Sequence, residues 1–295
     1  MVSRGAGAAR EGANVARQTD QRAHAAARQS RAWLVPLGRA GFAANGLVYV
    51  LVGVLSAQAA LGVGGETTDP EGALVHIIQA PFGQVVLGVV AVGLAGYAIW
   101  RLLQAVLDSE QKGTDPAGLA SRIGFGVSGV VYLGLAGTAV GLLLGNVGGD
   151  SANGDQAAQD RTALLLNQPF GRWLLAIVGV IVIGTGVAQI VNAWRAKFRE
   201  ELKEGEIDQG QREWITWVGR LGYVARGVVL WLVGLFLIVA AVQAEPQQAR
   251  GLGGVLATLA SQPAGPWLLG AVAVGLAAYG VFLLVEARYR RMVLT

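Results

Sequence analysis

The sequence predicts an all-α integral membrane protein with six transmembrane helices, arranged as three parallel two-helix repeats with pseudo-threefold symmetry. Three observations carry this prediction. The chain of 295 residues is 53% hydrophobic and only 14% charged, whereas soluble domains carry about 25% charged residues. Its apolar residues gather in six blocks that are long enough to cross a bilayer as helices. These blocks also resemble one another in alternating order along the chain.

The six predicted spans must be helical, because lipid offers no partners for an open backbone. Their expected bounds are 40–61, 84–107, 123–145, 171–194, 220–243 and 266–287. Lysine and arginine gather before the first span, in the second and fourth connections and at the C-terminus, whereas Arg161, Arg172 and Arg250 are the basic residues of the other connections. By the positive-inside rule, both termini are predicted to be cytoplasmic.

The odd-numbered spans share one opening, which is an arginine, any residue, a glycine and an aromatic residue. Its three copies are RAGFAANGLVY from Arg39, RIGFGVSGVVY from Arg122 and RLGYVARGVVL from Arg220. The even-numbered spans open alike at QAPFG, NQPFG and SQPAG. The unit is therefore a pair of helices, and three units of two spans each must share one orientation in the membrane.

These repeats set the predicted domain organisation. We expect a membrane domain at 39–295, with repeats at about 40–119, 120–217 and 218–295. The basic segment 1–38 is expected to be a cytoplasmic tail. The sequence leaves open whether the tail is disordered or forms a surface helix on the anionic inner leaflet.

With this pattern the chain resembles the bacterial integral membrane proteins known as the domain of unknown function 1206 family, which are built from three two-helix repeats. The resemblance rests on the Arg-x-Gly-aromatic openings and the Pro-x-Gly starts of the even spans. The second repeat departs most, because Ile181 and Thr185 stand where the first repeat has Gly93 and Tyr97. The resemblance implies a multi-pass protein of the bacterial cytoplasmic (inner) membrane, and it implies no activity.

The openings of the odd spans predict anchoring and close helix packing. Arg39, Arg122 and Arg220 are expected to mark the cytoplasmic interface, where an arginine can meet lipid phosphate. Glycines allow a neighbouring helix to approach closely. The glycines predicted to pack in this way are Gly41, Gly46, Gly124, Gly129, Gly222, Gly227, Gly134, Gly137, Gly141 and Gly145.

Each repeat also places one polar residue in each of its two spans at a similar predicted depth. The odd spans supply Asn45, Ser128 and Arg226, and the even spans supply Gln104, Asn192 and Glu286. We expect the two residues of each repeat to pair, because a charge inside the membrane costs roughly 2.5–3.5 kcal/mol and usually finds a partner. In the alternative, the charges of the third repeat reach the inner surface separately.

Two kinds of connection carry further predictions. The short apolar segments that end at Pro81, Pro169 and Pro263 are expected to form helices on the outer surface, or alternatively partial plugs of the bundle. The charged connection 195–213 is expected to continue the fourth span until Gly205 breaks the helix.

The composition excludes several kinds of function. The chain has no cysteine and two distant histidines, His24 and His76, so neither a thiolate site nor a metal cluster is expected. The pattern Gly124-x-Gly126-x-x-Gly129 follows no strand, so we expect no dinucleotide site. No catalytic residue, cofactor-binding residue or metal ligand is predicted, and no nucleic-acid partner.

We therefore expect a structural or interaction protein, a scaffold or partner subunit of the cell membrane, and no enzyme. Its expected partners are the lipid bilayer, anionic inner-leaflet lipids that contact the basic tail, and an unidentified protein. The alternative is a passive pore or a transporter of a small solute or lipid. An ion-coupled carrier is less well supported, because no Asp, Glu, Lys or His lies near the predicted span centres.

Overall fold

A computed structural model of the chain describes residues 35–107, 115–146, 154–202, 205 and 207–290. The predicted basic tail lies outside these residues except for its last four positions. The described helices are a first helix Val35–Leu61, α2 (Pro70–Gln79), α3 (Gly83–Leu107), α4 (Pro116–Leu143), α5 (Gly154–Leu166), α6 (Gly171–Trp194), η2 (Lys197–Glu201), α7 (Gln209–Gln243), η4 (Pro246–Gln248), α8 (Leu252–Ala260) and α9 (Gly265–Tyr289). No strand occurs in this part of the chain, which confirms the all-α class.

Six of these helices are long and apolar enough to cross a membrane, namely the first helix, α3, α4, α6, α7 and α9. The predicted continuation of the fourth span is wrong. α6 ends at Trp194, and Ala196 takes a left-handed conformation with φ 51°. The turn directs Phe198 into a buried contact with Phe282, with 5.0 Å between ring centroids. The polar residues before the fifth span instead lengthen α7, which begins at Gln209.

Exposed tryptophans mark two levels along the spans. Trp173 stands near the start of α6 and Trp194 is its last residue, and their side chains are 73% and 83% exposed. Their separation of 21 positions corresponds to about 32 Å of helix, close to the thickness of a hydrocarbon core. Trp267 is equally exposed near the start of α9, and Trp217 near the other end of the spans. Aromatic residues at two such levels are typical of membrane interfaces.

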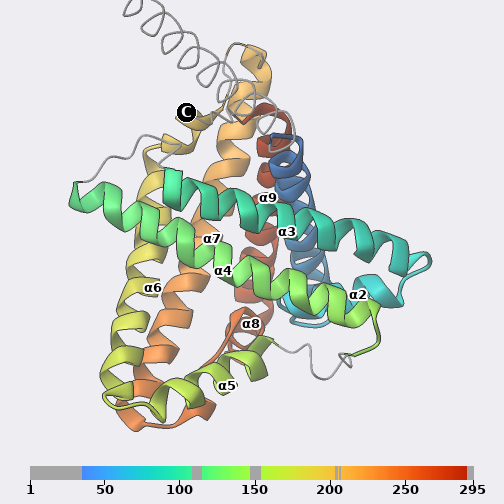
Figure 1. The fold of residues 1–295 in the computed structure, drawn as a ribbon. Coiled ribbons are helices and arrows are strands. Elements are labelled where there is room, and N and C mark those ends of the chain that lie inside the picture. Colours follow the sequence, from blue (N-terminus) through green and yellow to red (C-terminus); the bar gives the residue numbers. More distant parts are fainter. Residues whose placement is uncertain (1–34, 108–114, 147–153, 203–204, 206, 291–295) are drawn as a thin grey trace, which may run out of the picture.

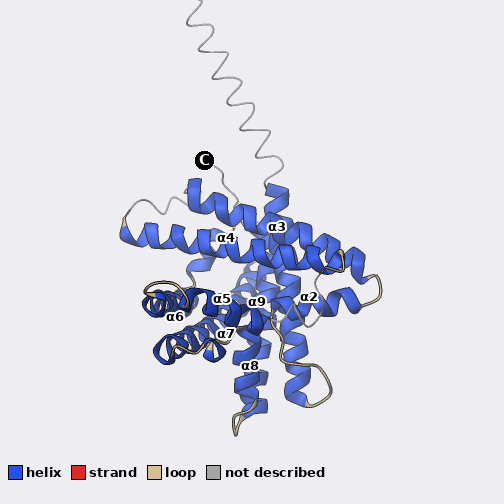
Figure 2. Ribbon diagram, turned by 60° about the horizontal axis from the view of Figure 1, so that its bottom comes forward, coloured by secondary structure: helices blue, strands red, loops and turns tan. Residues whose placement is uncertain are grey.

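The six spans contact one another in a ring that has one open side. α3 packs on α4, α6 on α7, and α7 on α9. The first helix closes on α3 at Gly41 and on α9 at Gly46. No comparable packing joins α4 to α6 among the described residues. In Figure 1, α3 and α4 run across the direction of α6, α7 and α9, and Figure 2 shows the α3–α4 pair apart from α6 and α7.

The second glycine of each odd opening makes the same contact in all three repeats. A Cβ added at Gly46, Gly129 or Gly227 would lie 2.7 to 3.1 Å from a backbone carbonyl oxygen of an even span. The backbone partners are the carbonyl oxygens of Gly280, Ala98 and Gly186, respectively. These three residues occupy one repeat position, directly after Tyr279, Tyr97 and Thr185. Each odd span therefore packs on the even span of another repeat, in cyclic order.

The first glycine of the opening divides the repeats. A Cβ on Gly41 would lie 2.5 Å from the backbone of Tyr97, and one on Gly222 the same distance from Tyr279, so the first and third repeats form tight hairpins. Gly124 has no atom of another helix within 4 Å. Its expected partner helix carries Ile181 and Thr185 in place of glycine and tyrosine.

The glycine face of α4 is consequently bare. Gly137 has no neighbour within 4 Å, and Gly134 has the Arg161 side chain at 3.9 Å as its nearest contact. Gly145 lies just past the end of α4 with φ 68° and has no neighbour either, while Gly141 is partly exposed. The expected contact between this stripe and a neighbouring helix is not made at Gly124, Gly137 and Gly145.

The short helices α2, α5 and α8 are neighbours on the side of the molecule away from the start of the first helix and the end of α9 (Figure 1). We call this the loop end, and the opposite end the terminal end. Leu74 of α2 and Leu256 of α8 are fully buried in the main core cluster. These two helices are thus packed into the end of the bundle, as the plug alternative expected, instead of lying on its surface.

Candidate functional site

The charge of Arg226 lies well inside the membrane-spanning region. Ala225 faces Gly275 near the middle of α9, and Gly227 faces Gly186 of α6. Gly186 is eight residues, or about 12 Å of helix, from Trp194 at the terminal-end aromatic level. Glu286 lies eleven residues beyond Gly275 on α9, which is about 16 Å further toward the terminal end. The two charges therefore occupy different depths.

The Arg226 guanidinium lies among tyrosines. Its Nε donates a hydrogen bond to the Tyr49 hydroxyl at 3.3 Å. Its Cζ lies 4.9 Å from the centroid of the Tyr279 ring and 5.8 Å from that of Tyr49. Such cation–π contacts offset part of the cost of a charge that has left water. The first helix, α7 and α9 thus meet at this arginine.

Glu286 has a different partner from the predicted one. The Nη1 of Arg290 donates to its Oε1, and the Nη2 of Arg290 lies 2.7 Å from the Glu201 carboxylate. The side chains of Glu286 and Arg290 are both almost fully buried. The predicted Arg226–Glu286 pair is replaced by this Glu286–Arg290–Glu201 cluster, because the glycine–tyrosine contact of the hairpin sets a register that separates the two levels.

The other two predicted pairs are not formed either. Asn45 is fully buried and neither its amide nitrogen nor its amide oxygen has a hydrogen-bond partner. The Gln104 side chain is buried, and its Oε1 accepts a hydrogen bond from Arg101 at 3.2 Å. Ser128 is partly exposed on α4, and Asn192 is exposed on α6, across the open side of the ring. The first and second repeats therefore also place their two polar residues at separate positions.

A network of four tyrosines was missed by the sequence reasoning. Tyr49 contacts Tyr279 edge to face at 4.9 Å, and Tyr97 contacts Tyr132 at 4.6 Å. Tyr132 of α4 also interacts electrostatically with Arg226. The signal was present, because Tyr49 and Tyr132 close the repeated odd openings and Tyr49 is one helical turn from Asn45 on the same face.

Two of the three predicted anchor arginines cap neighbouring helices. Arg122 donates to the carbonyl oxygens of Ala105 and Val106 at the end of α3, and Arg220 donates to that of Trp194 at the end of α6. These carbonyls have no partner within their own helices, so the contacts stabilise the C-termini of α3 and α6. The Nε of Arg39 is buried without a hydrogen-bond partner.

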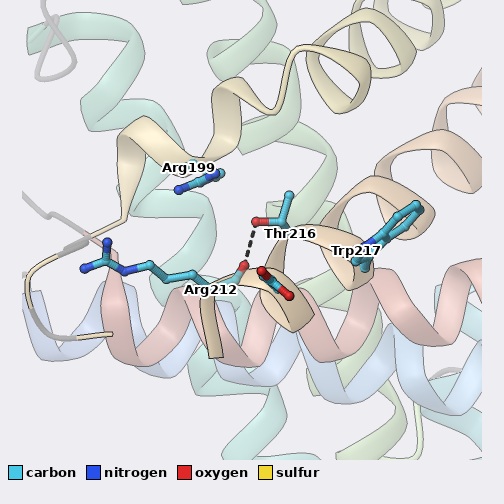
Figure 3. A pocket seen from close by; sticks show the side chains of 5 residues that line it. Arg199, Arg212, Thr216 and Trp217 are labelled. Carbon is cyan, nitrogen blue, oxygen red and sulfur yellow. Dashed lines mark hydrogen bonds between the residues drawn. The ribbon is translucent and has the colours of Figure 1, made fainter. Parts of the chain in front are cut away.

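A surface pocket of about 580 Å³ opens at the terminal end between η2 and the start of α7 (Figure 3). Its lining residues are Arg199, Arg212, Glu213, Thr216 and Trp217. The Thr216 hydroxyl donates to the Arg212 carbonyl at 2.6 Å, and the Arg212 Nε donates to the Ile207 carbonyl at 2.9 Å. The Glu213 carboxylate offsets part of the basic charge of this pocket.

Two aspartates join the loop-end helices. Asp69 caps α2 by accepting from the Gly72 amide at 2.8 Å, and it lies against Gly154 at the start of α5. Asp155 accepts from the amides of Gly251 and Gly254 at the start of α8. Burial, together with the nearby charges of Glu71 and Asp155, raises the pKa of Asp69 to about 6. The three repeats are therefore fastened together at this end.

Comparisons with known proteins agree with the repeat pattern. A family model described as Domain of Unknown Function (DUF1206) matches residues 40–108, 123–196 and 221–290. The uncharacterized protein YxxB of Bacillus subtilis (strain 168) is 35% identical over 264 residues, which cover 90% of this chain and 94% of that protein. No solved structure matches the chain. The three matched segments coincide with the three predicted repeats, and neither match indicates a catalytic activity.

Proposed function

Because the chain belongs to the DUF1206 family of multi-pass membrane proteins, which is defined without a function, we propose its role from the geometry: it is a structural or interaction protein, not an enzyme, that binds a partner through the open side between α4 and α6. The observation that carries this proposal is the bare glycine face of α4. Every other neighbouring pair of spans in the ring is closed by helix packing.

The occupant that fits this side is a transmembrane helix of a partner protein. Gly41 and Gly222, which are the repeat equivalents of Gly124, each take a helix backbone at close distance. Small residues allow such approach inside a membrane, where packing drives association. α6 borders the same side, and 17% of its most apolar 18-residue stretch is buried, compared with 50% of the corresponding stretch of α3. The second repeat thus offers the surface that the other two repeats use internally.

The distribution of charge supports the orientation that we propose. The terminal end carries the basic connections, which favours a cytoplasmic location for both termini in the bacterial inner membrane. The basic tail, which lies outside the described residues, then faces anionic inner-leaflet lipids. The passive pore or small-solute or lipid transporter remains a second candidate, because Arg226 lies about 12 Å inside the aromatic level.

Co-purification with matched variants tests the proposal. Gly124→Leu fills the bare face of α4, and Gly88→Leu is the control, because Gly88 of α3 also has no neighbour within 4 Å. After extraction in a mild detergent, wild type and Gly88→Leu should retain one partner protein in stoichiometric amount, and Gly124→Leu should lose it. The proposal would be overturned if both variants lost the partner or if no stoichiometric partner were found. It would also be overturned if the co-purifying protein were a second copy of this chain.

A further inference from the structure

Arg226 is a cation inside the membrane region whose counter-charge is not supplied by the described residues. Glu286, which was predicted to pair with Arg226, instead forms an ion pair with Arg290 at a different depth. In the part of the chain that the structure describes, no ion pair involves Arg226. Tyrosine rings reduce the cost of the charge but do not neutralise it. A negatively charged group from outside the described residues would do so.

Most of the hydrogen-bonding capacity of this guanidinium is unused. A guanidinium carries five N–H donors. The Nε–H donates to Tyr49, and no described acceptor takes the others. The residue also keeps partial exposure although it lies inside the ring of helices. Two parallel N–H groups of an arginine match the two oxygens of a carboxylate or phosphate, which a lone ammonium cannot do.

The first helix brings further unpartnered polar groups to the same face. Asn45 and Tyr49 are four residues apart, and Ser56 is seven residues beyond Tyr49, so all three project on one side of the helix. Asn45 and Ser56 are each 0% exposed, and neither amide atom of Asn45 nor the hydroxyl of Ser56 has a hydrogen-bond partner. Buried polar groups without partners are rare in native proteins and ask for an explanation such as a ligand.

We propose that Arg226, together with the Tyr49 hydroxyl and the Asn45 amide, forms a binding site for an oxyanion, namely a carboxylate or phosphate group. The anion neutralises Arg226 and accepts from its free N–H groups and from the Asn45 amide. The tyrosine rings and apolar side chains around it suit a ligand whose charged group is attached to an apolar body. The same chemistry is presented by a lipid-borne anion and by a free phosphate ion.

Thermal unfolding of the purified full-length protein in detergent tests this site. The probes are inorganic phosphate, dodecanoate and its uncharged analogue dodecanol. At a hundredfold excess over its Kd, a ligand should raise the Tm of the wild type by about 5 °C. Arg226→Leu should remove this shift, and the control Arg172→Leu should retain it, because Arg172 donates to the Ala241 and Val242 carbonyls at the surface of the bundle.

Arg226→Lys keeps the charge but loses the paired donors, so its apparent Kd should rise about tenfold, and this variant serves if Arg226→Leu does not fold. A response to dodecanoate alone assigns the site to a lipid-borne anion, and a response to phosphate alone to a soluble ion. The inference is overturned if dodecanol acts like dodecanoate, if no anion shifts the Tm of the wild type, or if every anion response survives in both Arg226 variants.

Discussion

The first and third repeats close their two spans on each other, whereas the second repeat holds its two spans apart. All three repeats begin with the same Arg-x-Gly-aromatic opening. In the closed repeats, Gly41 and Gly222 receive the backbone of a tyrosine from the even span, and in the second repeat Gly124 receives nothing. The opening therefore does not suffice for the hairpin contact, because the even span must also offer a complementary surface.

The polar residues of the even spans follow the same division. Gln104 and Glu286 are buried, and each is bonded to an arginine of its own helix, Arg101 and Arg290. Asn192 of the second repeat is exposed on α6. A closed hairpin thus buries the polar side chain of its even span and must supply a hydrogen-bond partner for it. In an open hairpin the side chain stays exposed and needs no such partner.

The largest expected effect comes from breaking the buried cluster of the third repeat. Arg290→Met removes the cation that contacts the buried Glu286 carboxylate, and such a loss typically costs 3–5 kcal/mol. We expect this decrease in the free energy of unfolding, measured by denaturant titration in detergent. The control Asn192→Leu should stay within about 0.5 kcal/mol of the wild type. If the two substitutions lowered the free energy of unfolding equally, the third repeat would not bury its polar residue more than the second repeat does.

A second expected effect concerns the loop end, where Asp69 and Asp155 tie the second repeat to the others. The pKa of Asp69 is raised from 3.8 to about 6, mainly by burial. The folded state therefore holds the proton more tightly than the unfolded state, and this stabilisation, present below pH 4, is lost as the pH rises to 6. From this group we expect a decrease of at most ~3 kcal/mol in that range.

Asp69→Asn keeps an oxygen that can accept from the Gly72 amide but cannot ionise. Its Tm should fall less than that of the wild type between pH 4 and 6. Some dependence should remain, because burial also raises the pKa of Glu71. The control is Asp115→Asn at the start of α4, where no side-chain cap bond exists. Parallel Tm profiles of wild type and Asp69→Asn would show that the loop-end carboxylate is not buried.

The comparison of repeats also shows how far the sequence reaches. Spans, repeats and loop helices follow from hydropathy and self-similarity, which are local properties of the chain. The depth of Arg226 relative to Glu286 does not follow from these properties. The prediction counted residues from the start of each span, which assumes that all spans enter the membrane at the same level. The actual register depends on Gly222 meeting Tyr279, and this contact separates the backbone levels of Arg226 and Glu286 by about 16 Å along the helix axis. The site around Arg226 also needs tyrosines from several helices.

The smallest expected effects, with opposite signs, come from the two equivalent glycines. In Gly222→Ala the new Cβ would lie 2.5 Å from the backbone of Tyr279, which has no room to move without separating α7 from α9. We expect a loss of about 1–3 kcal/mol, as for other overpacked contacts. Gly124→Ala adds its Cβ in open space and should stabilise α4 by up to about 1 kcal/mol, because alanine is the better helix former.

Both variants can be measured by the same denaturant titration in detergent. The sign of the change in the free energy of unfolding shows whether Gly124 contacts another helix of its own chain. If Gly124→Ala destabilises the protein as much as Gly222→Ala does, then Gly124 meets a helix of its own chain in the membrane and the second repeat closes like the others. If Gly124→Ala is stabilising in the isolated protein but weakens retention of a co-purifying partner, the same glycine serves an intermolecular contact. A methyl group at one repeat position thus separates a helix pair within the chain from one between chains.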